Sequence, residues 1–213
     1  MDFERFQERF ELAFPLVKRW ERLQLQDFCP SVRAGGGSRK IQYLLRIAAS
    51  CLEGNECYLE VGAFEGKSMI SALAFNSDVR GFACDNFSEE NREEVLFKNL
   101  ETHEVRERVK LLKGDFRQTL NEQEVDLPIG LFYYDGPHSV EGHQESLVLV
   151  ESLLAPRAMV VIEHWSVGRT QTGTYRALAR VARKWEIITV LPHRVDDKAT
   201  QWHKGIGVFR VDG

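Results

Sequence analysis

The chain has 213 residues, of which 43% are hydrophobic and 28% are charged, as in an ordinary soluble globular protein. Its formal net charge of −4 at pH 7 gives no basic footprint for nucleic acid. The apolar runs are shorter than the roughly 18 residues that a membrane span requires. Four cysteines without a C-x-x-C pair, and a charged N-terminus without the apolar core of a signal peptide, favour a reducing cytoplasm. We therefore expect neither a nucleic-acid partner nor a membrane partner.

The first 38 residues form a segment of their own. An aromatic stripe at helical spacing opens it, formed by Phe3, Phe6, Phe10 and Phe14. We expect the stripe to dock on the protein's own surface, with a homodimer contact or a substrate-pocket wall as alternatives. Three consecutive glycines at 35–37 must form a loop, interpreted either as a plain linker or as a hinge that closes over a site. The chain thus divides into an N-terminal helical extension with a glycine-rich loop, 1–38, and one domain, 39–213.

From residue 39 onward, helical and strand patterns alternate. After a helix at 40–52, strands are expected near 57–61, 80–84, 109–113, 130–134, 158–163, 186–191 and 206–211. Further helices are expected near 66–76, 90–102, 140–154 and 172–184. This alternation predicts a doubly wound α/β fold with seven strands, mostly parallel and covered by helices on both faces. The last two strands are joined without a helical pattern, so the final strand should be antiparallel.

The most informative run is CYLEVGAFEGKS, residues 57–68, which reads as a buried strand, a tight turn and a helix start. An E-x-G-x-x-x-G-x-S pattern is formed by Glu60, Gly62, Gly66 and Ser68. Glycine at 62 permits a sharp turn with positive φ, and glycine at 66 lets a ligand approach the backbone closely. The free N–H groups of the following helix suit polar ligand atoms, so the run predicts a nucleotide-type cofactor site. The alternative is a glycine turn without any ligand.

Phe64 and Lys67 stand where a dinucleotide fingerprint would need glycine, which argues against a nicotinamide oxidoreductase. The pattern with Glu60 instead resembles the first motif of class I S-adenosylmethionine-dependent methyltransferases. In that family, the loop holds the methionine end of the cofactor. A second run, YYDGPHS, places Asp135, Gly136 and His138 after the fourth strand. It resembles the branch that includes small-molecule and sugar O-methyltransferases, and the resemblance covers about residues 57–165.

Two further acids follow strand ends and are candidates for cofactor binding. Asp85 follows the second strand, and its carboxylate could accept both ribose hydroxyls of an adenosine cofactor; a loop or N-cap acid is the alternative. The resemblance places Asp115, after the third strand, beside the adenine, with a helix-capping role as the alternative. With Asp135, the expected cofactor-binding residues are Glu60, Gly62, Gly66, Ser68, Asp85, Asp115 and Asp135.

Asp135 and the pair Glu163–His164 end two strands that should be neighbours, so their side chains could converge. The resemblance implies divalent-metal ligands here, and the expected set is Asp135, Glu163 and His164, binding magnesium or manganese. A histidine weakens the case for magnesium and favours transition metals. Without a metal, the expected catalytic residues are Asp135, His138 and His164: a histidine removes the acceptor's proton and the acid orients its ring. A backbone hydrogen bond is the alternative role for His138.

Other residues near these strand ends have less specific interpretations. His143 is expected at the surface or in a capping position. Trp165 is assigned to local packing, with the acceptor pocket as the alternative. The final loop contains Asp196, Asp197, Trp202 and His203 and has two interpretations. It could form a lid over the substrate, or its charged residues could simply be solvated.

The resemblance therefore implies a cytoplasmic enzyme that uses S-adenosylmethionine to methylate a hydroxyl group of a small molecule, with or without a divalent metal. A non-catalytic cofactor-binding module with a degenerate acceptor site is the alternative, because Glu163–His164 departs from the family's usual pair.

Overall fold

The computed structural model describes residues 1–19, 32, 38–88, 91–121, 124–191, 202 and 204–213. Its strands are β1 (Cys57–Val61), β2 (Gly81–Asp85), β3 (Val109–Lys113), β4 (Ile129–Tyr134), β5 (Leu154–Glu163), β6 (Lys184–Leu191) and β7 (Ile206–Asp212). Its α-helices are α1 (Phe3–Arg19), α2 (Arg39–Ala49), α3 (Lys67–Leu73), α4 (Arg92–Thr102), α5 (Phe116–Thr119), α6 (Val140–Val150) and α7 (Gly168–Leu178). Two short 3₁₀ turns are η1 (Arg106–Arg108) and η2 (Glu151–Leu153).

The strands form one seven-stranded sheet in the order β3-β2-β1-β4-β5-β7-β6. Strands β1 to β5 pair in parallel, and β7 is antiparallel to both of its neighbours, β5 and β6. The expected doubly wound fold with an antiparallel last strand is confirmed. Strand β5 and helix α7 each begin four residues earlier than the sequence pattern indicated, and α5 was not anticipated.

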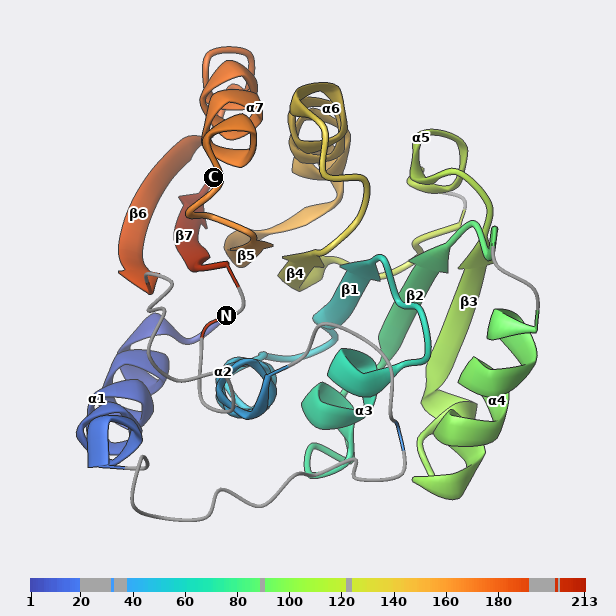
Figure 1. Ribbon diagram of the computed structural model, residues 1–213. Helices are drawn as coiled ribbons and strands as arrows, with labels where there is room; N and C mark the ends of the chain where they lie inside the picture. The colour runs from blue at the N-terminus through green and yellow to red at the C-terminus, as the bar shows by residue number, and fades with distance from the viewer. Residues whose placement is uncertain (20–31, 33–37, 89–90, 122–123, 192–201, 203) are drawn as a thin grey trace.

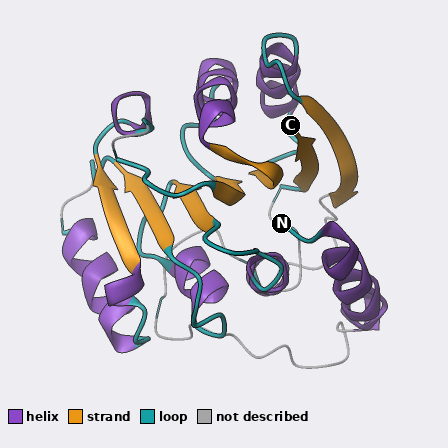
Figure 2. Cartoon of the chain, turned by 180° about the vertical axis from the view of Figure 1, so that it is seen from behind, coloured by secondary structure: helices purple, strands orange, loops and turns teal. Residues whose placement is uncertain are grey.

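Helices cover both faces of the sheet, with α1 to α4 on one face and α5 to α7 on the other (Figures 1 and 2). Alternate residues of the central strands supply the two cores. Tyr58, Leu131 and Met159 pack in the core under α1 to α4, and Leu59 and Phe132 in the core under α5 to α7. Both faces are therefore buried, which explains why β1 and β4 are apolar nearly throughout instead of alternating with polar residues.

The aromatic stripe at the N-terminus docks on the protein itself in its described part. Phe3 and Phe6 are buried in the core that contains α2, and the rings of Phe6 and Phe10 stack with centroids 5.4 Å apart. The docking expected for this stripe is thus confirmed for these residues. The triple glycine at 35–37 and the proposed lid acids lie outside the described residues.

The strand order reverses beside β1, because β2 lies on one side of it and β4 on the other. In open α/β sheets, ligands bind beyond the carboxyl ends of the strands at such a switch point. The described helices include none that is long and apolar enough to cross a membrane.

Candidate active site

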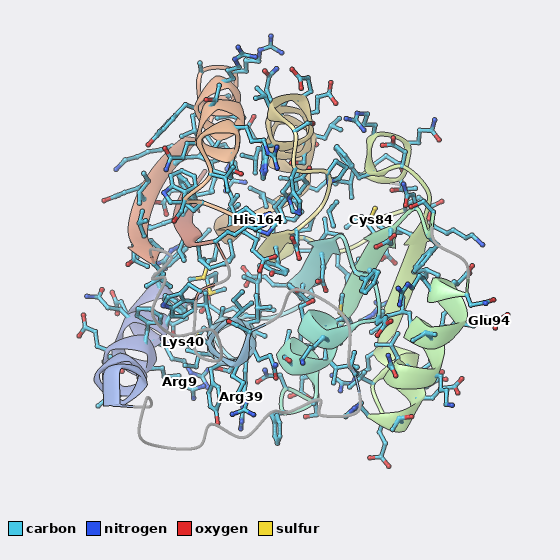
Figure 3. The ribbon with its side chains drawn as sticks, in the orientation of Figure 1. Arg9, Arg39, Lys40, Cys84, Glu94 and His164 are labelled. Carbon is cyan, nitrogen blue, oxygen red and sulfur yellow. The ribbon has the colours of Figure 1, made fainter. Side chains whose placement is uncertain are left out.

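A cavity of about 540 Å³ opens at the carboxyl ends of β1, β2, β3 and β4. It is lined by Val61, Gly62, Cys84, Asp85, Asn86, Ser88, Gly114, Asp115, Phe116, Asp135, Gly136, Pro137 and His138. The cavity lies where the strand order reverses, and Figure 3 labels Cys84, which is in β2, and His164, which follows β5. Of the residues expected from the sequence, Gly62, Asp85, Asp115, Asp135 and His138 line the cavity.

The two glycines of the turn after β1 are required by packing within the protein. Gly62 has φ +91°, and a Cβ there would lie 2.2 Å from the carbonyl oxygen of Asp135. Gly66 has φ +86° and begins α3, and a Cβ there would lie 2.6 Å from Leu96 Cδ1 on α4. Glycine at 66 therefore suits the positive φ and leaves room for the Leu96 side chain, and the ligand approach expected from the sequence stays a prediction.

Glu60 and Ser68 are joined directly across the turn. Ser68, in the first turn of α3, donates its hydroxyl to Glu60 Oε1. The Glu60 side chain is fully buried, and this burial raises the pKa of its carboxyl well above the usual value. This pair fastens the start of α3 to the end of β1, immediately beside the cavity.

Asp85 ends β2 and holds two loops through its carboxylate. Its Oδ2 accepts a hydrogen bond from Phe64 N at 2.8 Å, and its Oδ1 accepts one from Phe87 N at 2.9 Å. Phe64 and Phe87 both have φ near +47°, an uncommon conformation for an aromatic residue. Each carboxylate oxygen has a second lone pair, so Asp85 can still accept hydroxyl groups from the cavity.

Asp115 has the helix-capping role that the sequence left open as one alternative, and its place beside an adenine stays a prediction. It caps α5, because its Oδ1 accepts a hydrogen bond from Arg117 N at 2.9 Å, and it pairs with the Arg117 guanidinium at 3.1 Å. It also lines the cavity at the end of β3.

Asp135, His138 and His164 come together at the ends of β4 and β5, which pair side by side. The Nδ1 atoms of His138 and His164 lie 3.0 Å apart, and His138 Nε2 lies 3.6 Å from Asp135 Oδ1. His164 is buried and has φ +59°, so the backbone turns sharply after β5 and directs this residue to the site. One ligand atom from each of the three side chains lies within 4.8 Å of those of the other two.

Glu163 has a different environment from the one the sequence suggested. Its side chain is fully buried, and burial raises the pKa of the carboxyl to about 7. In the described part of the chain, the set that could share one metal ion contains His138 in place of Glu163. Glu163, the residue before His164, is therefore outside this set.

The expectation of a surface position for His143 is wrong. Its side chain is fully buried between α6 and α7, where Nε2 lies 3.1 Å from Thr170 Oγ1. Burial, followed by the charges of His138 and Arg169, lowers the pKa of His143 to about 4. Trp165 packs edge-on against Phe209 with ring centroids 5.3 Å apart, in agreement with its assignment to packing.

Several cavity residues were missed from the sequence. Asn86 and Ser88 line the cavity directly after Asp85, and Phe116 lines it directly after Asp115. Their position next to acids at strand ends was the available signal. That signal indicated the acids alone.

A family model described as "Methyltransferase domain" matches residues 59–165, which is about half of the chain. The chain belongs to this methyltransferase family. The matched segment of the methyltransferase begins in β1 and ends just after His164, so it contains the glycine turn, the cavity and the Asp135–His138–His164 set. Comparison of the sequence with curated proteins gave no match.

Solved structures with the same fold include several methyltransferases. The O-methyltransferase TomG from Streptomyces achromogenes, involved in tomaymycin synthesis and solved with SAM, is 17% identical with a TM-score of 0.65, over 93% of this chain and 96% of that one. An O-methyltransferase from Bacillus cereus, in complex with SAH, is 17% identical with a TM-score of 0.59, over 96% and 90%. A precorrin 8w decarboxylase from Methanobacterium thermoautotrophicum is 21% identical with a TM-score of 0.59, over 86% and 95%.

At these identities, the structural likeness concerns the fold. Together with the family match, it confirms the expected class I S-adenosylmethionine-dependent methyltransferase. The decarboxylase among the neighbours means that the acceptor and the details of the reaction must be argued from this methyltransferase's own residues.

Proposed function

We propose that this methyltransferase transfers the methyl group of S-adenosylmethionine to a hydroxyl group of a small molecule. The observation that carries the proposal is the convergence of Asp135, His138 and His164: the first two line the switch-point cavity, and His164 contacts His138. These residues supply the groups that can orient an acceptor hydroxyl and remove its proton.

The cavity suits the proposed cofactor in size and charge. A volume of about 540 Å³ falls within the range of about 300–1,000 Å³ common for small-molecule sites. Three aspartates line it, and their negative charge favours the positively charged sulfonium. In this proposal, the turn at 62–66 with Glu60 and Ser68 holds the methionine end, Asp85 receives the ribose hydroxyls, and Asp115 lies by the adenine.

The hydrogen bonds of the histidine pair suggest which nitrogen acts as the base. Two Nδ1 atoms 3.0 Å apart must share one proton, so one donates and the other accepts. If His164 donates, His138 Nδ1 accepts and its Nε2–H faces the Asp135 carboxylate, 3.6 Å from Oδ1. This arrangement leaves the lone pair on His164 Nε2, which is the nitrogen that we assign to proton removal. Asp135 and His138 then act as positioning residues.

Methyl transfer needs alignment above all, because the sulfonium is already an activated donor. Holding the acceptor in line can supply about 7–11 kcal/mol, and a placed base adds about 100- to 10,000-fold. His164 lies at the end of a strand in the core of the sheet, so the protein holds this base rigidly.

A divalent metal is part of the proposal as its second form. Asp135, His138 and His164 would hold it, and two imidazoles with one carboxylate suit manganese better than magnesium. A bound metal would lower the pKa of the acceptor hydroxyl and orient it. A small-molecule acceptor, a cytoplasmic location, a homodimer through the N-terminal helix and the absence of nucleic-acid or membrane partners also remain predictions.

Calorimetric titration of chelator-treated protein with S-adenosylhomocysteine, with NADH as the control ligand, tests the cofactor. Saturable binding of S-adenosylhomocysteine, without binding of NADH, supports the cofactor assignment. If manganese strengthens this binding in the wild type but not in Asp135→Asn, the metal-assisted form is supported. Turnover is then measured as S-adenosylhomocysteine release with phenolic and sugar acceptors. Binding without turnover on any acceptor would favour the non-catalytic module, and no binding of the homocysteine product would refute the proposal.

A further inference from the structure

The turn between β1 and α3 adopts a conformation that its own residues do not favour. Phe64, at its centre, has φ +47°, and the left-handed region is costly for a residue with a large side chain. Something outside the turn must therefore hold it. The backbone N–H of Phe64 is held from β2 by Asp85, at 2.8 Å.

Helix α4 supplies the other restraints on this turn, and Figures 1 and 2 show it beside α3 on the same face of the sheet. The guanidinium carbon of Arg92, the first residue of α4, lies 4.3 Å from the centroid of the Phe64 ring. The same guanidinium forms an ion pair with Glu65, whose side chain is almost completely buried. Two turns farther along α4, Asn99 Nδ2 donates to the carbonyl oxygen of Glu65 at 2.9 Å.

We infer that Arg92 is a positioning residue for the cofactor: it holds Phe64 and Glu65 so that the turn keeps the shape that binds S-adenosylmethionine. This inference rests on the proposed function, in which the turn holds the methionine end of the cofactor. Arg92 contacts two consecutive residues of the turn by two different interactions, a planar stack and an ion pair. Only a guanidinium provides both, because a lysine ammonium is a point charge without a planar face.

The expected effect is on cofactor affinity. Without Arg92, the turn samples other conformations, and the fraction competent to bind falls, which lowers the apparent affinity by the same factor. For Arg92→Ala, we expect the Kd for S-adenosylhomocysteine to rise about tenfold, since a partly buried cation–π contact and an ion pair are lost together. Arg92→Lys keeps the charge next to Glu65 but loses the stack, so its Kd should lie between those of Arg92→Ala and the wild type.

The chain contains a matched control for this substitution. Arg106, in η1, stacks on Phe97 of α4 with its guanidinium carbon 4.4 Å from the ring centroid, and its guanidinium donates to the carbonyl oxygen of Val109 at 3.2 Å. Arg106→Ala removes a similar cation–π contact with α4. Any change in ligand binding in this variant therefore measures the effect of a general loss of stability. Calorimetric titration with S-adenosylhomocysteine and hydrogen exchange of residues 61–68 should be measured for the wild type and each variant.

Weaker binding and faster exchange of residues 61–68 in Arg92→Ala, with wild-type values for both in Arg106→Ala, are the expected results. Wild-type affinity in Arg92→Ala, or an equal loss in Arg106→Ala, would overturn the inference. If Arg92→Ala does not fold, the same titration and hydrogen-exchange measurements are made on Arg92→Lys and Glu65→Gln and compared with the wild type. If the wild type itself does not bind the ligand, the proposed function fails, and the exchange rates still decide whether Arg92 holds the turn.

Discussion

His143 connects the stability of this methyltransferase to pH in a way that can be calculated. The ring is fully buried between α6 and α7, and its Nδ1 has no hydrogen-bond partner among the described residues. Protonation would place a charge there without an acceptor, in agreement with the lowering of the pKa of His143 to about 4 by burial. In the unfolded chain, a histidine titrates near pH 6.5, as is usual for this side chain.

The sign of the effect follows from proton linkage. Between these two pKa values, the unfolded chain binds a proton at His143 and the folded protein does not, so acid favours unfolding. The stabilisation by the neutral ring is present above pH 6.5 and is lost as the pH falls toward 4. With these two pKa values, the loss between pH 7 and pH 5 is about 1.8 kcal/mol in the free energy of unfolding.

The measurement is urea unfolding at pH 7, 6 and 5 for the wild type and for His143→Gln, which is neutral at every pH. The difference in unfolding free energy between the two proteins should decrease by about 1.8 kcal/mol from pH 7 to pH 5. Taking this difference cancels the carboxyl groups that titrate in the same range. The control substitution is His103→Gln, at the C-cap of α4 and outside the α6–α7 interface. The unfolding free energy of this variant should decrease from pH 7 to pH 5 as much as that of the wild type. A constant difference between wild type and His143→Gln across this range would refute the reasoning.

Three further predictions concern the site and the scaffold beneath it. Gly62→Ala should lower the free energy of unfolding by about 2–4 kcal/mol in urea titrations, because its Cβ would lie 2.2 Å from the Asp135 carbonyl oxygen at positive φ; an unchanged midpoint would contradict this. Arg183→Met should cost about 2 kcal/mol, because the Arg183 guanidinium donates to three consecutive carbonyls at the start of β5, and the thermal midpoint should fall. His164→Ala should reduce kcat by about 100- to 10,000-fold, with little change in the Kd for S-adenosylhomocysteine; equal turnover would exclude His164 as the base.

The fold could be predicted from the sequence because the patterns that indicate strands, helices and turns each depend on residues that are neighbours in the chain. Strand and helix periodicity, the glycine turn at 62–66 and the lack of a helical sequence pattern between the last two strands were sufficient to predict a seven-stranded doubly wound sheet. The same logic placed Asp85, Asp115 and Asp135 at strand ends, where the cavity was then found. Parallel strands bring their carboxyl ends to one edge, so strand assignment alone indicated which acids would gather there.

What the sequence could not determine depends on side chains that meet from distant elements. Whether His138 or Glu163 joins His164 is decided by the backbone turn after β5 and by the depth at which Glu163 is buried. His143 was misplaced because the partner that buries it, Thr170, belongs to the next helix. The contact of Gly66 with Leu96 on α4 likewise joins two elements that are distant in the chain. Periodicity describes which face a residue occupies along one element, whereas burial, pKa and ligand geometry are set by what packs against that face.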